Sequence, residues 1–515
     1  MSKIGKINFN PEVKKTLEQV SALHDSVGDT SQLQTQEKTL VGAINEVKQF
    51  GNSVKQRLVS SLLSVDSGLP ITIYSTWDEI IDQSKTIQIS NTGTNDINGI
   101  IERYKIHAGE TVSAGDFVEF ISTIGSMSAK TPIVFESANS SYISAVMLNE
   151  IKVLVSFSDE GNGGYGTAVV LTIDDTYITA GPPVIFESAN ISSISAVKLN
   201  ENKVLLNYRD IGNSNYGTAI VLSINGSSIT TGSPIVFESA STSYISAVAL
   251  NENKVVVSYR DIGNSGYGTA IVLTINGSSI TAGSPIVFES ANTTEISAVA
   301  LSENKVIVGY RDDGNSYYST AIILTINGSS ISKGTPTVFE NTNTTNISAV
   351  KLSENKVIVS YRDNGNSAYG TAIVLTINGN SITKGSPIVF NSTTTSCISA
   401  VLLNANKVLA SYRDESNNNH GTSVVLSVDD TSITIGSPII FNSGSTAYIS
   451  AVPLNKNKVL VSYQNKANSN YGTSIIINAN IDLTIKKSTS REAIHGVAQM
   501  AGTDGQTITV KTLSL

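Results

Sequence analysis

An acid, an amide and a tyrosine recur together in this 515-residue chain, within polar segments of the form Tyr-Arg-Asp-x-Gly-Asn-Ser-x-Tyr-Gly. Carboxylate and amide groups can hydrogen-bond the hydroxyl groups of a sugar, and the apolar face of a tyrosine ring can stack against it. The pattern therefore suggests recognition of a carbohydrate. Candidate ligand-binding residues in three copies are Asp210, Asn213, Tyr216, Asp261, Asn264, Tyr267, Asp363, Asn366 and Tyr369.

The same residue types also have a purely structural explanation. Asp side chains accept hydrogen bonds from the backbone amides of tight turns, where Gly is favoured as well. The spacing resembles a loosened Asp box, a hairpin of sialidases and other propellers, with Tyr in place of its Trp and a changed interval to the ring. That resemblance implies that the acid holds the turn together, away from catalysis. The acid recurs at Asp159, Asp210, Asp261, Asp312, Asp363 and Asp414, and Asn465 replaces it in the last copy.

Other patterns argue against catalysis. The four histidines lie on different elements without the spacing of metal ligands, and no nucleophile, zinc-protease or phosphate-loop motif is present. The sequence therefore predicts a protein that is not an enzyme and that holds neither a cofactor nor a metal ion. The arginines of the repeated segment are expected not to converge, because each has the neighbours of its own repeat, and they are Arg209, Arg260, Arg311, Arg362 and Arg413.

These segments belong to a repeat of 51 residues, marked by prolines at Pro132, Pro183, Pro234, Pro285, Pro336, Pro387 and Pro438. Fixed spacing in β-type sequence is typical of a radially repeated sheet. Seven copies within 127–488 predict a seven-bladed β-propeller in a mainly β protein. A β-solenoid is the competing fold, although its coils are usually shorter. In the third copy we expect antiparallel strands at 244–250, 254–261, 269–275 and 284–290.

The order of strands within the repeat predicts how the ring closes. The sequence of a fourth strand comes first, at 132–137, so we expect it to complete the blade that begins at Ile449. Such a strand joins the two ends of the ring and leaves no exposed edge.

One face of the ring is predicted to carry recognition. In an antiparallel blade, the hairpin between strands two and three emerges on the same face as the link from strand four to the next blade. The residues of this face differ between copies, whereas the turns of the opposite face hardly vary, and variation on a fixed scaffold favours recognition. The residue after the acid shows the variation: Glu160, Ile211, Ile262, Asp313, Asn364, Glu415 and Lys466.

The flanks have a different composition. Residues 1–66 read as helical, with a heptad-like seam from Leu40 to Val65 that predicts a parallel bundle between chains, most simply a trimer. A helix lying on the neighbouring domain is the alternative. A small linker module is expected at 67–103. Residues 104–126 and 489–515 are expected to pair as the halves of a small β-domain into which the ring is inserted.

Composition limits the possible partners and locations. The net charge is −8 and no block of Lys or Arg is present, so nucleic acid is not an expected partner. Cys397 is the sole cysteine, which excludes a disulfide framework. The start lacks the apolar segment of a signal peptide and no long apolar run occurs, so we expect synthesis in a cytoplasm and no membrane insertion.

Several motifs resemble those of one group of proteins. EKTLVGAINEVK (37–48) resembles a linker-helix motif of tail-fibre and baseplate proteins in bacteriophages and phage-like particles of Gram-positive bacteria. The segment at 54–82 resembles another module of these proteins, and AGETVSAGDFVEF with AIHGVAQMAGTDGQTITV looks like the split halves of a small β-domain in phage structural proteins. The repeat itself is similar to propeller repeats of such fibres. The resemblance implies a virion appendage whose N-terminal helices attach and trimerise.

The leading hypothesis is therefore a tail-fibre or receptor-binding protein that recognises a host cell-surface glycan through the propeller. Its expected partners are other tail or baseplate proteins, bound through the N-terminal helices of a homotrimer, and host carbohydrate. It would be made in the host cytoplasm and reside in the virion. The alternatives are a purely structural baseplate, neck or head-fibre component without a ligand, and a glycan-cleaving propeller enzyme.

Overall fold

The computed structural model describes residues 101–106, 111–112, 117–174, 177–404, 406–487, 496–498, 502–503 and 507–512. The chain divides into two compact units, one made of Met1–Ser122 and Leu483–Leu515 and the other of Thr123–Asp482. The predicted helical region 1–66, with its coiled-coil seam, and most of the linker module 67–103 lie outside the described residues.

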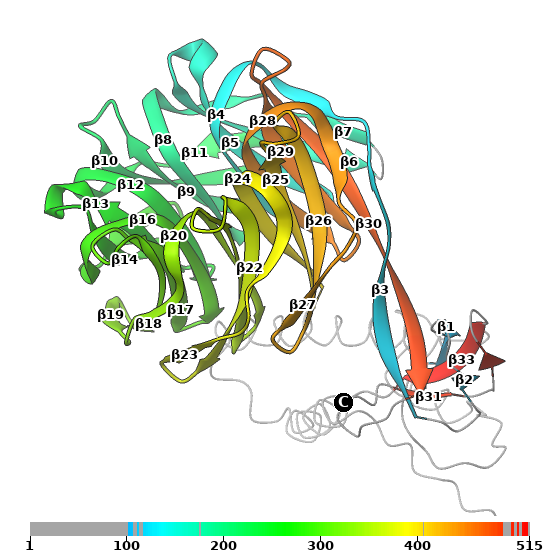
Figure 1. Cartoon of the computed structure of the whole chain (residues 1–515). Helices are drawn as coiled ribbons and strands as arrows, with labels where there is room; N and C mark the ends of the chain where they lie inside the picture. The colour runs from blue at the N-terminus through cyan, green and yellow to red at the C-terminus, as the bar shows by residue number, and fades with distance from the viewer. Residues whose placement is uncertain are drawn as a thin grey trace, which may run out of the picture. The chain divides into compact units, whose positions relative to one another are not determined.

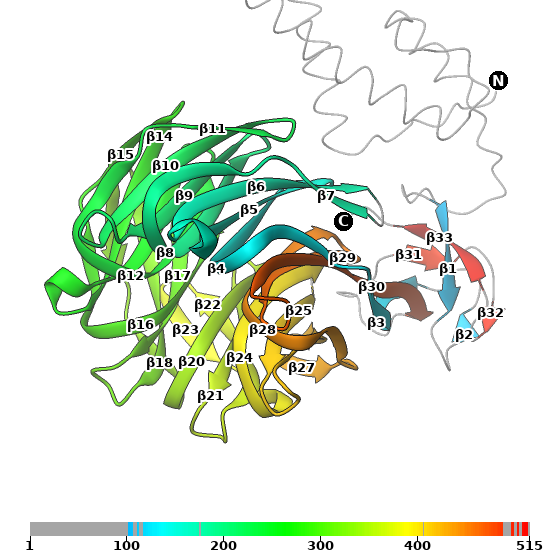
Figure 2. The same ribbon diagram turned by 90° about the horizontal axis from the view of Figure 1, so that it is seen from above.

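The larger unit is a ring of antiparallel β-sheets (Figures 1 and 2). The third repeat shows the pattern. The second half of β12 (Ile235–Asn251) pairs with β13 (Lys254–Asp261), and β13 pairs with β14 (Tyr267–Asn276). The strand β14 then pairs with both β15 (Ser279–Ala282) and the start of β16 (Ile286–Ser302). The mainly β, antiparallel ring predicted from the sequence is confirmed.

The same strands recur in the other repeats. The remaining long strands are β4 (Ile133–Asn149), β8 (Val184–Asn200), β20 (Thr337–Ser353), β24 (Ile388–Asn404) and β28 (Ile439–Asn455). The second strands are β5 (Lys152–Asp159), β9 (Lys203–Asp210), β17 (Lys305–Asp312), β21 (Lys356–Asp363), β25 (Lys407–Asp414) and β29 (Lys458–Asn465). The third strands are β6 (Tyr165–Asp174), β10 (Tyr216–Asn225), β18 (Tyr318–Asn327), β22 (Tyr369–Asn378), β26 (His420–Asp429) and β30 (Tyr471–Lys487). The short strands are β7 (Tyr177–Ala180), β11 (Ser228–Thr231), β19 (Ser330–Lys333), β23 (Ser381–Lys384) and β27 (Ser432–Ile435).

The outer edge of each sheet contains a short strand that was not predicted from the sequence. In the third repeat, Gly277 takes a left-handed φ of 65° in a two-residue turn, and β15 returns along β14 from Ser279. Ile280 of β15 is buried, which explains why this short polar segment stays on the sheet. Pro285 has no N–H to donate and interrupts the strand just before β16. The sequence prediction of a plain turn followed by a strand at 284–290 missed β15.

The link between one repeat and the next is also extended rather than a loop. The residues of β16 up to Asn292 pair with β14, and from Thr293 onward the same strand pairs with β17 of the next repeat. Each long strand therefore belongs to two neighbouring sheets. The point at which the strand passes from one sheet to the next lies at the end of the ring that carries the hairpins between second and third strands.

The ring closes as predicted. The start of β4 pairs antiparallel with β30, joining Ile133 to Ser474 and Val134 to Thr473, and the first and last repeats lie side by side in both views (Figures 1 and 2). A serine in each inner segment also accepts the backbone N–H of an alanine in the following repeat, at 2.9–3.1 Å. The bond from Ala145 to Ser450 links the two ends and closes this series of hydrogen bonds.

The hydrophobic core lies between neighbouring sheets. Val257 and Tyr259 of β13, for example, share a buried cluster with Leu205 and Val221 of the preceding repeat. At the closure, Phe135 shares a cluster with residues of the last repeat, including Leu460. Stability is thus distributed over the junctions, as expected for a repeat that cannot bury its own faces alone.

The smaller unit is built from both flanks of the ring. Its described strands are β1 (Ile101–Ile106), β2 (Thr111–Val112), the start of β3 (Phe117–Ala129), β31 (Gly496–Ala498), β32 (Gly502–Thr503) and β33 (Thr507–Thr512). From Thr123 onward, β3 belongs to the larger unit. Antiparallel pairings join β1 to β33, β2 to β32 and β3 to β31. Strands that precede the ring in the sequence therefore pair with strands that follow it.

Candidate functional site

The acids of the repeated hairpin hold the turn. Asp210 Oδ1 accepts the backbone N–H of Asn213 at 3.0 Å, Asp261 Oδ1 that of Asn264 at 3.1 Å, and Asp363 Oδ1 that of Asn366 at 3.2 Å. All three acids are buried. The structural interpretation of the acid is therefore confirmed at these positions, and the carboxylates face their own turns.

The other predicted site residues lie on the same hairpins but differ in exposure. Asn213, Asn264 and Asn366 are exposed at the tips, whereas Tyr216, Tyr267 and Tyr369 are half-buried where the third strand begins. Each trio belongs to the hairpin of its own repeat. The amide and the tyrosine of each trio are thus the members that solvent reaches.

In four repeats a Tyr–Glu pair that sequence reasoning missed supports the hairpin. The hydroxyl of Tyr259 donates to Glu238 Oε2 at 2.8 Å, and the hydroxyl of Tyr208 donates to Glu187 Oε2 at 3.0 Å. Burial raises the pKa of both Glu187 and Glu238, an effect that the tyrosine hydrogen bond opposes. A constant separation of 21 residues between this Glu and this Tyr is the signal in the sequence that could have revealed the pair.

We expect the ring to lose stability as the pH rises from mildly acidic to neutral. The folded-state pKa values of Glu187 and Glu238 lie above the ordinary 4.5, so the folded protein holds protons that the unfolded chain has released. This stabilisation is complete below the ordinary pKa and is lost as the pH passes through the raised one. Melting temperatures across this window test it. Glu238→Gln should flatten the dependence, and the same change at exposed Glu201 should not. A melting temperature that rises with pH would contradict the prediction.

Seven residues with left-handed backbone surround the central opening at the hairpin end. They precede the innermost strand segment of each repeat, have φ between 47° and 55°, and form what we call the mouth ring: Tyr142, Ser193, Tyr244, Glu295, Asn346, Cys397 and Tyr448. Left-handed backbone is uncommon for such residues, and its recurrence shows that a β-bulge is built into every repeat. The side chain at this position differs from copy to copy, while the backbone does not.

Some neighbours within the mouth ring touch one another. The rings of Tyr142 and Tyr448 have centroids 5.1 Å apart across the closure. Glu295 Oε2 accepts the N–H of Asn346, and Asn346 Oδ1 accepts the N–H of Cys397, both at 2.6 Å. Tyr142, Tyr244 and Tyr448 are 36–39% exposed, so three aromatic rings reach solvent around one opening.

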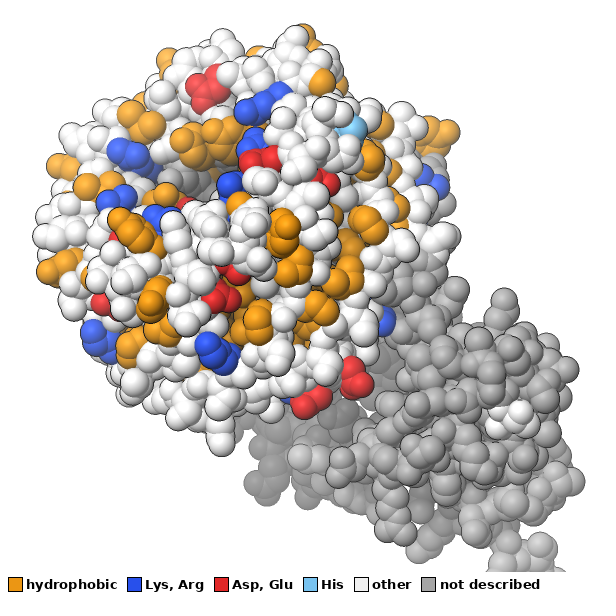
Figure 3. Space-filling view, viewed as in Figure 1, with side chains coloured by type: hydrophobic (Ala, Val, Ile, Leu, Met, Phe, Trp, Pro, Cys, Tyr) orange, Lys and Arg blue, Asp and Glu red, His pale blue; other side chains and the backbone are white. Residues whose placement is uncertain are grey.

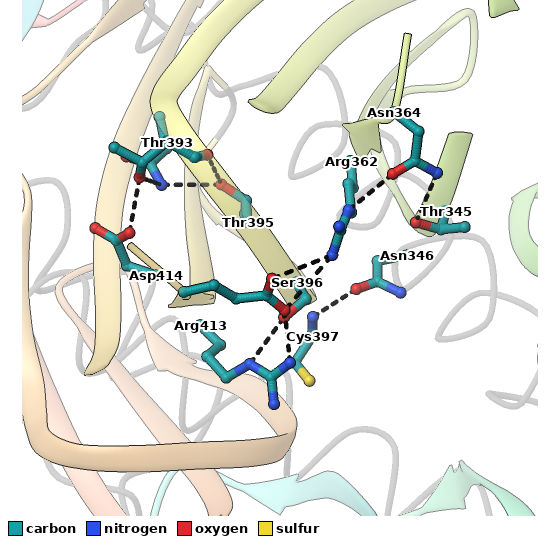
Figure 4. Close-up of polar contacts among 12 residues, drawn as sticks. Thr345, Asn346, Arg362, Asn364, Thr393, Thr395, Ser396, Cys397, Arg413 and Asp414 are labelled. Carbon is teal, nitrogen blue, oxygen red and sulfur yellow. Dashed lines mark hydrogen bonds and ion pairs between the residues drawn. The ribbon is translucent and has the colours of Figure 1, made fainter. Parts of the chain in front are cut away.

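Arginines lie next to the mouth ring, one residue before the hairpin acid in five of the repeats, and Figure 4 draws Arg362 and Arg413. Arg311 Nε donates to Asp313 at 2.7 Å, and Arg362 Nε donates to Asn364 at 2.8 Å. Nη1 of Arg362 also lies 3.5 Å from Oε2 of Glu415 in the following repeat. Arg413 of that repeat binds the same carboxylate. The prediction that these arginines do not converge is thus wrong for this pair, because a carboxylate after the hairpin acid bridges two repeats.

The inner strands below the mouth ring line an open, apolar depression of about 400 Å³. Its lining comes from the small and branched residues of β12, β16, β20, β24 and β28, with Lys351 as the charged exception. Toward the opposite end, a second cavity of about 670 Å³ is lined by polar turn residues that include Glu303 and Glu354. The face of the ring seen in Figure 3 is mostly uncharged, with scattered charges.

Within the described ranges, no group of three or more His, Cys, Asp or Glu side chains is arranged to hold a metal ion. Cys397 is a half-buried free thiol in the mouth ring. Among the helices in the described part of the chain, none has the length and apolarity needed to cross a membrane.

Comparison with known proteins gives structural neighbours only. No family model and no curated protein matches the chain. A protein of unknown function from Dyadobacter fermentans is similar in structure, with 13% identity and a TM-score of 0.44 over 69% of this chain and 99% of that one. The SapL1 lectin in complex with α-methyl fucoside has 14% identity and a TM-score of 0.38 over 59% and 97%. A point mutant of the NanB sialidase from Streptococcus pneumoniae has 14% identity and a TM-score of 0.42 over 68% and 71%.

Proposed function

We propose that this chain is a receptor-binding appendage of a bacteriophage or phage-like particle. Its ring is a seven-bladed β-propeller that binds a host cell-surface glycan at the hairpin end and does not cleave it. Residues 1–66 attach three chains to tail or baseplate proteins of the particle. The motifs at 37–48 and 54–82 and the form of the repeat support this assignment, since they resemble those of phage fibres.

The mouth ring is the observation that carries the proposal. Its seven positions share one backbone conformation and stand just before the residues of the serine hydrogen-bond series, yet the side chains are varied. A fixed frame with varied side chains is the arrangement expected of a recognition surface. Tyrosine combines an apolar ring with a hydroxyl group, which suits the faces and edges of a sugar.

Binding without cleavage fits the state of the carboxylates. Glycoside hydrolysis usually needs a pair of carboxyl groups free to act on the sugar. Here the hairpin acids Asp210, Asp261 and Asp363 accept turn amides, and Glu187 and Glu238 accept tyrosine hydroxyls. Weak sites on three chains would gain strength from multivalent attachment.

Binding of the full chain to host wall polysaccharide is expected to fall about tenfold or more when Tyr142, Tyr244 and Tyr448 are all replaced by alanine. Each aromatic contact contributes roughly 0.5–1.5 kcal/mol, so three together exceed the ~1.4 kcal/mol of a tenfold change. Glycan-array binding measures the effect. Tyr177→Ala is the matched control, because this tyrosine is 73% exposed on the short outer strand β7.

The hairpin tyrosines are tested by a second variant in the same binding experiment. Alanine at Tyr216, Tyr267 and Tyr369 together tests the residues predicted from the sequence. Loss of binding in this variant alone would move the site from the mouth ring to the hairpins. No glycan bound by the intact chain would refute the recognition proposal, and release of reducing ends from the polysaccharide would refute the absence of cleavage.

A further inference from the structure

One carboxylate in the ring is held by two arginines from neighbouring repeats (Figure 4). Glu415 Oε1 accepts a hydrogen bond from Arg413 Nη2 at 2.6 Å and from the hydroxyl of Ser396 at 2.6 Å. Nη1 of Arg362, in the preceding repeat, lies 3.5 Å from the same carboxylate. Burial alone would raise the pKa of Glu415, but Ser396, Arg413 and Arg362 outweigh it and hold the pKa below its ordinary value. This place in the repeat is therefore built to hold an oxyanion.

The same place three repeats earlier has the cations but no anion. The equivalents of Arg362, Arg413 and Ser396 are Arg209, Arg260 and Ser243, whereas Ile262 stands where the carboxylate of Glu415 belongs.

Arg209, Arg260 and Ser243 therefore lack the hydrogen-bond partner that Glu415 provides in its own repeat. No hydrogen bond or ion pair joins Arg209 or Arg260 to another side chain in the described part of the chain. Nε of both arginines and Oγ of Ser243 are buried without a hydrogen-bond partner. Half-buried, unpaired charge is unfavourable, and a charge-assisted hydrogen bond relieves it.

The place is reachable from solvent. Ile262 is 38% exposed, and both arginine side chains are only half-buried although their Nε atoms are covered. Tyr244 of the mouth ring follows Ser243 directly and is 38% exposed. Arg260 and Arg311 act on the phenol of Tyr244 electrostatically, as do the carboxylates of Glu295 and Asp313. An aromatic ring thus stands near the unpaired guanidinium group of Arg260 at the opening.

We propose that Arg209, Arg260 and Ser243 form a subsite for an oxyanion carried by the glycan, with the sugar ring against Tyr244. The inference rests on the proposed function and names its ligand class as an acidic carbohydrate. A ligand carboxylate or phosphate takes the place that Glu415 occupies in its own repeat. Arg209 and Arg260 then share it as Arg362 and Arg413 share Glu415.

Calorimetric titration of the full chain tests the subsite with three probes. Methyl glucuronide and methyl glucoside share a ring and differ in the carboxylate, and glycerol 3-phosphate supplies a phosphate. The glucuronide is expected to bind about tenfold or more tightly than the glucoside at low salt, because a charge-assisted hydrogen bond contributes ~1.5–3 kcal/mol. Tighter binding of glycerol 3-phosphate would identify phosphate as the natural group.

Ile262→Glu is the decisive variant, since it supplies the missing acid in the chain itself. Preference for either anion should disappear, and the variant should melt no lower than the parent. Ile151→Glu adds the same charge at an exposed turn between β4 and β5 and should keep the preference. Arg209→Gln with Arg260→Gln should lose it.

Equal affinity for glucuronide and glucoside, no binding of any probe, or an unchanged preference in Ile262→Glu would overturn the subsite. Strong array binding to neutral glycans without any charge preference would overturn the subsite and leave the proposed function intact. Failure of the chain to bind any glycan on the array would instead refute the proposed function.

Discussion

Replacing Phe135 by alanine is expected to destabilise the ring more than the same change at Phe288. Both rings are buried, and each packs against an aromatic residue of the neighbouring sheet with centroids 5.4 Å apart. Removing a buried phenyl group costs about 3–5 kcal/mol. Only Phe135, however, lies in the closing strand, which meets β30 through noncovalent contacts between the two ends of the ring.

Denaturant unfolding of the full chain measures the free energy of unfolding that each variant loses, and hydrogen exchange locates the strands that unfold locally. The Phe135→Ala variant should exchange faster in β4 and β30, while the Phe288→Ala variant should show its loss around β16 and β17. Equal free energies of unfolding, with no faster exchange at the closure, would show that the closing strand is no weaker than an internal junction.

Gly217→Val is expected to destabilise the ring. A Cβ atom there would lie 2.6 Å from Cε2 of Phe237 and 2.7 Å from its Cζ, closer than real side chains approach. Valine adds two further methyl groups to this contact, so we expect a loss of about 1–3 kcal/mol or more. Thermal and denaturant unfolding measure it.

The fourth repeat provides the matched comparison. Ser319 occupies the position of Gly217, and Phe339 beside it stands 5.9 Å from Tyr361, compared with 5.3–5.5 Å for the Phe–Tyr pairs of the other repeats. The aromatic ring has moved to admit one small side chain. Gly217→Ser should therefore cost much less than Gly217→Val. A Val variant as stable as the parent would show that the ring can move further than this repeat suggests.

The fold was largely predictable because repetition makes weak signals consistent. A single run such as KVVVSYRD is an ambiguous strand, but the same run at a fixed interval indicates one sheet after another. The fourth-strand sequence at 132–137 comes before the first full repeat, which also predicted that it closes the ring. The short strand β15 was missed, since four polar-rich residues after an Asn-Gly turn carry too little pattern and depend on the burial of Ile280.

The site was less predictable because it depends on contacts between distant residues. The role of Asp210 in its turn followed from local chemistry. The left-handed backbone of Tyr244 could not be foreseen, because glycine is the usual marker of that conformation and the mouth ring contains none. The meeting of Arg362 and Arg413 at Glu415 depends on a side chain that reaches across a junction, which repeat equivalence alone does not show.

The ring is entered and left at one spot, since Lys130 donates its N–H to the carbonyl of Ile476 at 2.9 Å and Ile133 faces Ser474. A domain whose first and last residues are neighbours can be replaced as one piece. Another ring, or a simple hairpin turn, would join the same two chain positions without changing the residues that flank the ring. On the proposed function, one exchange of this kind replaces the specificity of the appendage.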